Sequence, residues 1–185
     1  MSTLSNSQLR EISASARCIY SESQVEAALD EMAAAITRKL EDSNPILLSV
    51  MNGALIVTAK LATRLHFPLQ LDYLHVTRYR GNTCGGDLDW KCYPSLSLQD
   101  RAVLVVDDIL DEGATLECVV SYCKQGGASE VLTAVLVEKL HEHKLSSIEA
   151  DFVGLQVDDY YIYGYGMDYK GYFRNLPGIY AIAKA

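Results

Sequence analysis

The feature that most constrains the fold is an apolar run, Ala102–Val106, that leads directly into several carboxylates, a glycine and a segment of helical periodicity. A short, uniformly apolar run of this kind is typical of a strand buried on both faces. Two further runs, Ile46–Val50 and Val131–Val137, have the same character. Helical segments separate these runs, so the sequence predicts an α/β fold in which ligands bind at the carboxyl ends of a mostly parallel sheet.

Three segments have the spacing expected of helices. Ser21–Glu41 carries apolar residues at steps of three and four behind serine cap signals. Ala54–Leu65 follows Gly53, and Thr115–Gln125 ends at a pair of glycines. A further strand is expected at Leu69–Thr77.

The length of 185 residues suits a single domain spanning 1–185. We expect a core over about 20–150 and a small hood lobe over about 151–185, formed with part of the N-terminus, because the tail from Phe152 is rich in glycine and tyrosine. The segment 78–97 is irregular, which favours a mobile lid, although an insertion without function is the alternative.

Charge and composition exclude several classes of partner. The formal net charge is −8 and the sequence pI is about 4.9, so the surface repels phosphate backbones and a nucleic-acid partner is not expected. The N-terminal residues lack the apolar stretch of a signal peptide, and no later run is long enough to enter a membrane. The five cysteines are odd in number and form no C-x-x-C pair. We therefore expect a cytoplasmic protein with reduced thiols.

The turn after Val106 has the composition of a sugar-phosphate site. The backbone amides of 111–115 and the Thr115 hydroxyl could enclose a phosphate at a helix N-terminus, and Gly113 permits a tight turn. Asp107 and Asp108 at the strand end suit a sugar diol or a hydrated Mg²⁺, which would also offset the repulsion between carboxylates and phosphate. A single aspartate here would be read as a helix cap, but three within five residues favour a ligand site.

The segment Val103–Leu116, VLVVDDILDEGATL, resembles the phosphoribosyl pyrophosphate (PRPP) motif of type I phosphoribosyltransferases. The wider chain is similar to the hypoxanthine-guanine branch of that family, through three further blocks at Leu48–Ala54, Leu136–Lys139 and Asp151–Pro177. This resemblance implies the type I phosphoribosyltransferase fold, with a hood lobe. It also implies purine salvage, in which Mg²⁺-dependent transfer of phosphoribose from PRPP to hypoxanthine or guanine gives IMP or GMP.

The resemblance implies that the phosphoribosyl group binds at the turn after Val106, which we call the acidic turn. Asp107 and Asp108 would hold the ribose hydroxyls and Mg²⁺, while Asp111 would act as general base on the purine N7. The 5′-phosphate would be bound by Asp111, Glu112, Gly113, Ala114 and Thr115. Pyrophosphate would be bound by Met51, Asn52 and Gly53, with a cis Met51–Asn52 peptide, and by Arg174.

The purine site is assigned on the same basis. Lys139 would donate to the 6-oxo group, with Glu138 as its competitor in register because the spacing to the next block is one residue longer than usual. Tyr161 would stack on the base, the backbone of Ile162 and Asp168 would meet its edge, and Asp168 would also hold a metal ion. The lid would begin at Arg78 and Tyr79, where the family usually has Ser-Tyr.

Other interpretations remain open from the sequence. The family resemblance implies a homodimer or homotetramer. A non-catalytic phosphoribosyltransferase-fold nucleotide regulator and an aspartate-nucleophile phosphatase are the alternative functions.

His141 and His143 are expected to be solvent-exposed, since no cysteine or carboxylate framework accompanies them. Trp90 is either a partner contact or a local packing anchor.

Overall fold

The computed structural model describes residues 4–78 and 88–182. Its centre is a six-stranded sheet in the order β4-β3-β2-β5-β6-β7. All neighbours are parallel except β4 and β3. The mostly parallel α/β architecture predicted from the strand-helix alternation is confirmed. The strands are β2 (Ile46–Met51), β3 (Gln70–Arg78), β4 (Leu88–Cys92), β5 (Ala102–Leu110), β6 (Glu130–Leu140) and β7 (Phe152–Asp158).

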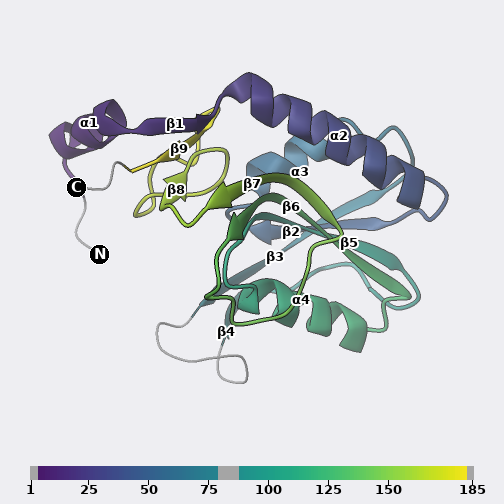
Figure 1. Cartoon of the computed structure of the whole chain (residues 1–185). Helices are drawn as coiled ribbons and strands as arrows, with labels where there is room; N and C mark the ends of the chain where they lie inside the picture. The colour runs from purple at the N-terminus through teal and green to yellow at the C-terminus, as the bar shows by residue number, and fades with distance from the viewer. Residues whose placement is uncertain (1–3, 79–87, 183–185) are drawn as a thin grey trace.

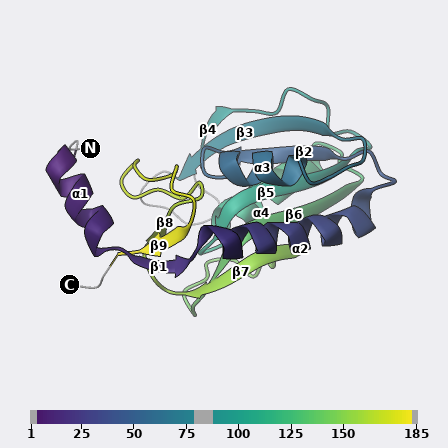
Figure 2. The same cartoon turned by 90° about the horizontal axis from the view of Figure 1, so that it is seen from above.

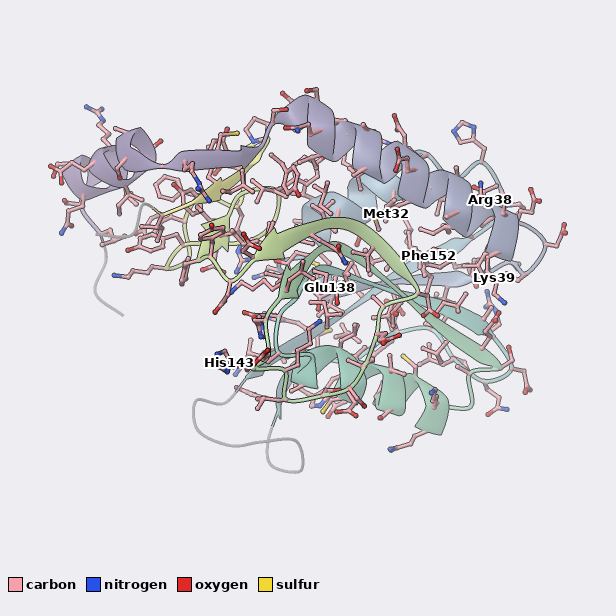
Figure 3. All side chains as sticks on the ribbon, in the orientation of Figure 1. Met32, Arg38, Lys39, Glu138, His143 and Phe152 are labelled. Atoms are coloured by element: carbon pink, nitrogen blue, oxygen red, sulfur yellow. The ribbon has the colours of Figure 1, made fainter. Side chains whose placement is uncertain are left out.

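Helices cover both faces of this sheet. α2 (Glu22–Leu40) and α3 (Leu55–Ala62) lie over one face, and α4 (Ala114–Gln125) lies over the other (Figure 1). The apolar stripe of α2 faces inward, and Figure 3 shows Met32 between this helix and the sheet. Strands β2 and β5 are almost entirely buried, as their uniformly apolar runs predicted. Among the described residues, no helix combines the length and apolarity needed to cross a membrane.

A second, three-stranded sheet lies beside the carboxyl ends of the main sheet. It has the order β1-β9-β8, from β1 (Arg17–Tyr20), β8 (Ile162–Tyr163) and β9 (Ile179–Ala181). Chain segments from both ends of the sequence thus form one lobe, the hood, which Figure 2 shows displaced from the main layers. α1 (Asn6–Ser15) precedes β1 and buries none of its residues.

Three segments differ from the sequence expectations. Phe152–Asp158 was assigned to the hood but is a parallel strand of the main sheet. Its Gly154 leaves room for Met32, whose sulfur would lie 2.7 Å from an added Cβ, so α2 packs directly on this strand. Leu88–Cys92, within the segment expected to be irregular, pairs antiparallel with β3. The N-terminal α1 and β1 were not predicted: α1 buries no residue, so it lacks an apolar stripe, and the four residues of β1 form a strand by pairing with the C-terminal strand β9.

The hood is fastened to the main lobe by a charged network around Glu26 of α2. Its carboxylate accepts hydrogen bonds from Lys60 and the Tyr165 hydroxyl, both at 2.7 Å, and pairs with Arg64 at 2.5 Å. Burial raises the pKa of Glu26, but the hydrogen bonds from Lys60, Tyr165 and Arg64 outweigh it and lower the pKa to about 2. The ionised form of Glu26 therefore links α2, α3 and the hood.

Close backbone contact provides the second fastening. Gly166 has φ +107, and a Cβ at this position would lie 2.1 Å from the carbonyl oxygen of Gly53. Only glycine permits both this backbone conformation and this approach. The hood therefore rests directly on the turn that follows β2.

Replacing Glu26 by Gln should destabilise the protein by roughly 1 kcal/mol at neutral pH, after allowance for partial solvent exposure. Because the folded-state pKa is depressed, the contribution is fully present above the ordinary value of 4.5 and is lost as the pH falls towards 2. Denaturant melts of both proteins from pH 7 to pH 2.5 should show the stability difference narrowing below about pH 4.5. Glu31→Gln, on the exposed face of the same helix, is the control.

Replacing Gly166 by Ala should displace the hood from the turn at Gly53. The matched control is Gly171→Ala, since Gly171 also has positive φ (+88) but has no atom within 4 Å of an added Cβ. The control should lose only the backbone cost of about 1–2 kcal/mol, whereas Gly166→Ala should lose clearly more in thermal melts. Equal losses would show that the close contact is unimportant.

Candidate active site

Parallel pairing brings the carboxyl ends of β2, β5 and β6 to one edge of the sheet. The pairing of β2 with β5 ends at Ser49 and Val106, whereas β5 itself continues to Leu110. The strand is thus longer than expected, and Asp107 and Asp108 lie within it instead of at its end, on a part that β2 no longer flanks. This leaves an opening beside the two aspartates on the side towards β2.

A cavity of about 470 Å³ occupies this opening. Ten of the residues predicted to form the site line it: Met51, Asn52, Gly53, Asp107, Asp108, Asp111, Gly113, Thr115, Asp168 and Arg174. They come from three separate parts of the chain, including the hood. His75 and Thr77 of β3 also line it and were not predicted, since nothing in the sequence marks them apart from other strand residues.

The other predicted residues do not line this cavity. Lys139 lies next to it, against Asp111, while Tyr161 in the hood is 55% exposed and Ile162 is buried. Glu112 and Ala114 belong to the turn between β5 and α4 but are not part of the lining. Arg78 is the last residue of β3, and Tyr79 lies outside the described residues, as do 80–87 of the expected lid.

The turn between β5 and α4 has the geometry of an anion site. Gly113 is the N-cap of α4 with φ +85, which a side chain would strain, and its carbonyl accepts from Glu117 N–H at 3.0 Å. The amides in the first turn of an α-helix point towards its N-terminal end, and the helix dipole places partial positive charge there. Thr115, in the first turn, lines the cavity. These groups suit a phosphate ester.

Asp107 and Asp108 provide two buried carboxylates beside that turn, each only 8% exposed. The Asp108 N–H donates to an Asp107 carboxylate oxygen at 2.9 Å. Burial raises the pKa of Asp108, while its contact with Asp107 and the charge of Arg174 act in the opposite direction. A divalent cation would stabilise the ionised pair, and a set of carboxylate oxygens is the donor set that Mg²⁺ prefers. The residues therefore fit Mg²⁺.

The loop after β2 closes the cavity from the other side. The Met51–Asn52 peptide is cis, as the family resemblance implied. A Cβ at Gly53 would lie 2.1 Å from a carboxylate oxygen of Asp108, so the glycine backbone lies directly against that side chain. From the hood, Arg174 donates to the Gly166 carbonyl at 2.6 Å and pairs with Asp168 at 2.5 Å. The arginine is thus held at the cavity wall.

Lys139 faces the site from the end of β6. Its ammonium lies 3.3 Å from Asp111 Oδ2 and 3.2 Å from Asp159 Oδ1. Glu138, the competing residue in register, pairs instead with Lys144 at 2.7 Å on the other side of the strand. Strand alternation explains this division, because successive side chains point to opposite faces.

His141 contradicts the expectation of a solvent-exposed residue. Its side chain is 6% exposed, and its Nε2 lies 2.7 Å from Asp111 Oδ1. His143, by contrast, is exposed, and Figure 3 shows it at the outer side of the loop after β6. Spacing alone did not separate the two histidines, because only the pairing of β6 with β5 puts His141 beside Asp111.

Asp111, His141 and Asp159 form a possible cation site, since one ligand atom of each lies within 4.8 Å of the others. The ammonium of Lys139 already contacts two of the three groups. A metal ion would have to displace that positive charge, so the geometry favours an internal ion pair at this position.

Trp90 is a packing residue. Its ring stacks on Tyr93 at a centroid distance of 5.0 Å and contacts Tyr122 of α4 at 4.8 Å. Close by, Asp72 of β3 accepts the N–H groups of Ser95 and Leu96, both at 2.7 Å. The chain segment that follows β4 is therefore held against β3 and α4.

Comparisons with known proteins agree with this geometry. Residues 15–170 match the family model of the phosphoribosyl transferase domain. The hypoxanthine-guanine phosphoribosyltransferase of Bacillus subtilis (strain 168) is 32% identical over 165 residues, which are 88% of this chain and 91% of the relative. The hypoxanthine-guanine-xanthine phosphoribosyltransferase of Tritrichomonas foetus is 31% identical over 163 residues, 88% of this chain and 89% of the relative.

A solved structure of a hypoxanthine-guanine-xanthine phosphoribosyltransferase superposes with a TM-score of 0.83 at 28% identity, covering 91% of this chain and 97% of the other. Fold, acidic turn and sequence similarity thus agree over most of the chain. The chain belongs to the phosphoribosyltransferase family.

Proposed function

We propose that the protein transfers the 5-phosphoribosyl group of PRPP to N9 of hypoxanthine or guanine, giving IMP or GMP and pyrophosphate. The observation that carries this proposal is the pair formed by the Asp111 carboxylate and the Lys139 ammonium, 3.3 Å apart beside the acidic cavity. A 6-oxopurine presents O6 and N7 on one edge. The ammonium can donate only to O6, and the carboxylate can accept the proton carried by N7.

The same pair explains the preference for 6-oxopurines. Adenine carries a 6-amino group, whose hydrogens would face the ammonium without an acceptor between them. A buried donor left without an acceptor is costly, so the wrong base is rejected strongly. Tyr161, half exposed in the hood, is available to stack on the base. The choice among hypoxanthine, guanine and xanthine depends on backbone groups near Ile162 and Asp168.

In the proposed reaction, N9 attacks C1′ of the ribose, the bond from C1′ to the pyrophosphate oxygen breaks, and Asp111 takes the proton from N7. Asp107 and Asp108 hold the ribose hydroxyls. The amides of 111–115 and Thr115 hold the 5′-phosphate. Mg²⁺, held by Asp107, Asp108 and Asp168, would neutralise charge that develops on pyrophosphate. Arg174 and the 51–53 loop bind the same leaving group.

A pyrophosphate-release assay with PRPP and Mg²⁺ tests the function, with hypoxanthine, guanine, xanthine and adenine supplied one at a time. Release should require an oxopurine and should fail with adenine. Asp111→Asn should fold normally and lose roughly 10²- to 10⁴-fold in kcat, the usual contribution of a positioned acid-base group. Full activity of this variant would refute the assigned base, and release without any purine would refute the transferase.

The oligomeric state and the compartment belong to the same proposal. We expect a homodimer or homotetramer, supported by the exposed apolar side chains Leu55, Leu71 and Tyr73 on the α3–β3 face. Large apolar side chains gathered on one face are typical of an interface.

The described cysteines form no disulfide, which supports a cytoplasmic protein.

Leu71→Asp tests the assembly. If α3 and β3 meet a second copy, the charge will be buried at the interface and sedimentation should show a shift to monomer. Leu145→Asp, at a position 55% exposed in the loop after β6, should leave the assembly unchanged and is the control. An unchanged assembly for Leu71→Asp, or a wild-type monomer, would contradict this interface.

A further inference from the structure

The loop that joins β6 to β7 braces the turn that carries Asp111. The amides of Leu145 and Ser146 donate to the Glu112 carbonyl at 2.9 and 3.2 Å. A Cβ at Gly113 would lie 3.1 Å from Ile148 and 3.2 Å from Ser146, so the loop lies flat against that glycine. The backbone on the C-terminal side of Asp111 is therefore fixed by residues from a different strand connection.

His141 is the first residue after β6, which ends at Leu140. It acts on the Asp111 side chain itself. Its Nε2 lies 2.7 Å from Asp111 Oδ1, and its Nδ1 accepts the His143 N–H at 3.1 Å. A ring nitrogen that accepts a hydrogen bond carries no proton, so the proton of the neutral ring lies on Nε2. His141 therefore donates to the Asp111 carboxylate, and the backbone at His143 selects the tautomer that does so.

The two oxygens of Asp111 thus have separate partners. Oδ1 is held by His141, and Oδ2 lies 3.3 Å from the Lys139 ammonium. A carboxylate held at one oxygen by a buried imidazole cannot rotate freely, so the other oxygen keeps its position beside the lysine. With the His141 side chain only 6% exposed, water does not readily replace this contact.

We propose that His141 is a positioning residue for Asp111: it fixes the carboxylate so that Oδ2 is presented to the purine edge together with the Lys139 ammonium. This inference rests on the proposed function, since it assumes that Asp111 receives the purine proton. His141 touches no substrate in this arrangement and acts through Asp111. Its effect should therefore fall on kcat and leave PRPP binding unchanged.

Two substitutions of His141 separate hydrogen bonding from packing. His141→Gln places an amide donor near the position of Nε2, whereas His141→Leu fills much of the volume without a donor. We expect Leu to lower kcat roughly 10- to 100-fold, the scale of a misplaced reacting group, with little change in KM for PRPP. Gln should recover most of the loss. His143→Gln is the matched control: it keeps the backbone amide that donates to His141 Nδ1 and removes only the ring, which stacks on the His141 ring at a centroid distance of 6.0 Å. It should therefore retain wild-type kinetics.

Asp111→Asn distinguishes failure of this inference from failure of the proposed function. If Asp111→Asn is inactive while His141→Leu is fully active, the positioning role is wrong and the proposed base stands. If Asp111→Asn is fully active, the base assignment itself is wrong. The double variant should be no slower than Asp111→Asn, since His141 acts only through the carboxylate. Equal losses in the Leu and Gln variants would assign His141 a packing role and overturn the proposal.

Discussion

The parallel pairing of β2, β5 and β6 is the constraint on which the rest of the structure depends. It brings three strand ends to one edge, so that the loop after β2, the aspartates of β5 and Lys139 of β6 converge without any being near the others in sequence. Because β2 stops pairing at Val106, the two aspartates open onto a cavity while their strand stays buried. Rigid strands hold chemical groups more accurately than free loops.

Burying a charged side chain is costly, and this molecule offsets that cost in two different ways. The paired carboxylates of Asp107 and Asp108 are almost fully buried, which suits a site completed by a cation. Around Glu26, by contrast, the protein supplies its own cations and a tyrosine, so that the hood is tied to the helices that flank the sheet. We infer that the first arrangement serves a ligand, whereas the second holds in place the hood, which carries Arg174 and Asp168.

Secondary structure could be predicted wherever local pattern and tertiary environment agree. The helix α2 and the strands β2 and β5 were predicted to within a few residues, because the amphipathic pattern of the helix and the apolar runs of the strands both reflect burial directly. Strands β4 and β7 were missed as strands of the main sheet. Each pairs at an edge of the sheet, where only one neighbour is present and the pattern is weak. β7 also owes its place to Gly154, which admits Met32 from a distant helix.

The sequence by itself determined the acidic turn and the family, because a phosphate site at a strand-helix junction needs particular residues at fixed local spacing. It also indicated Lys139, although Glu138 remained possible until the strand register was known. Only the tertiary structure decided that His141 is buried against Asp111 while His143 is exposed. The physical reason is that a hydrogen bond between residues 30 positions apart depends on how two strands align, and no local pattern encodes that alignment.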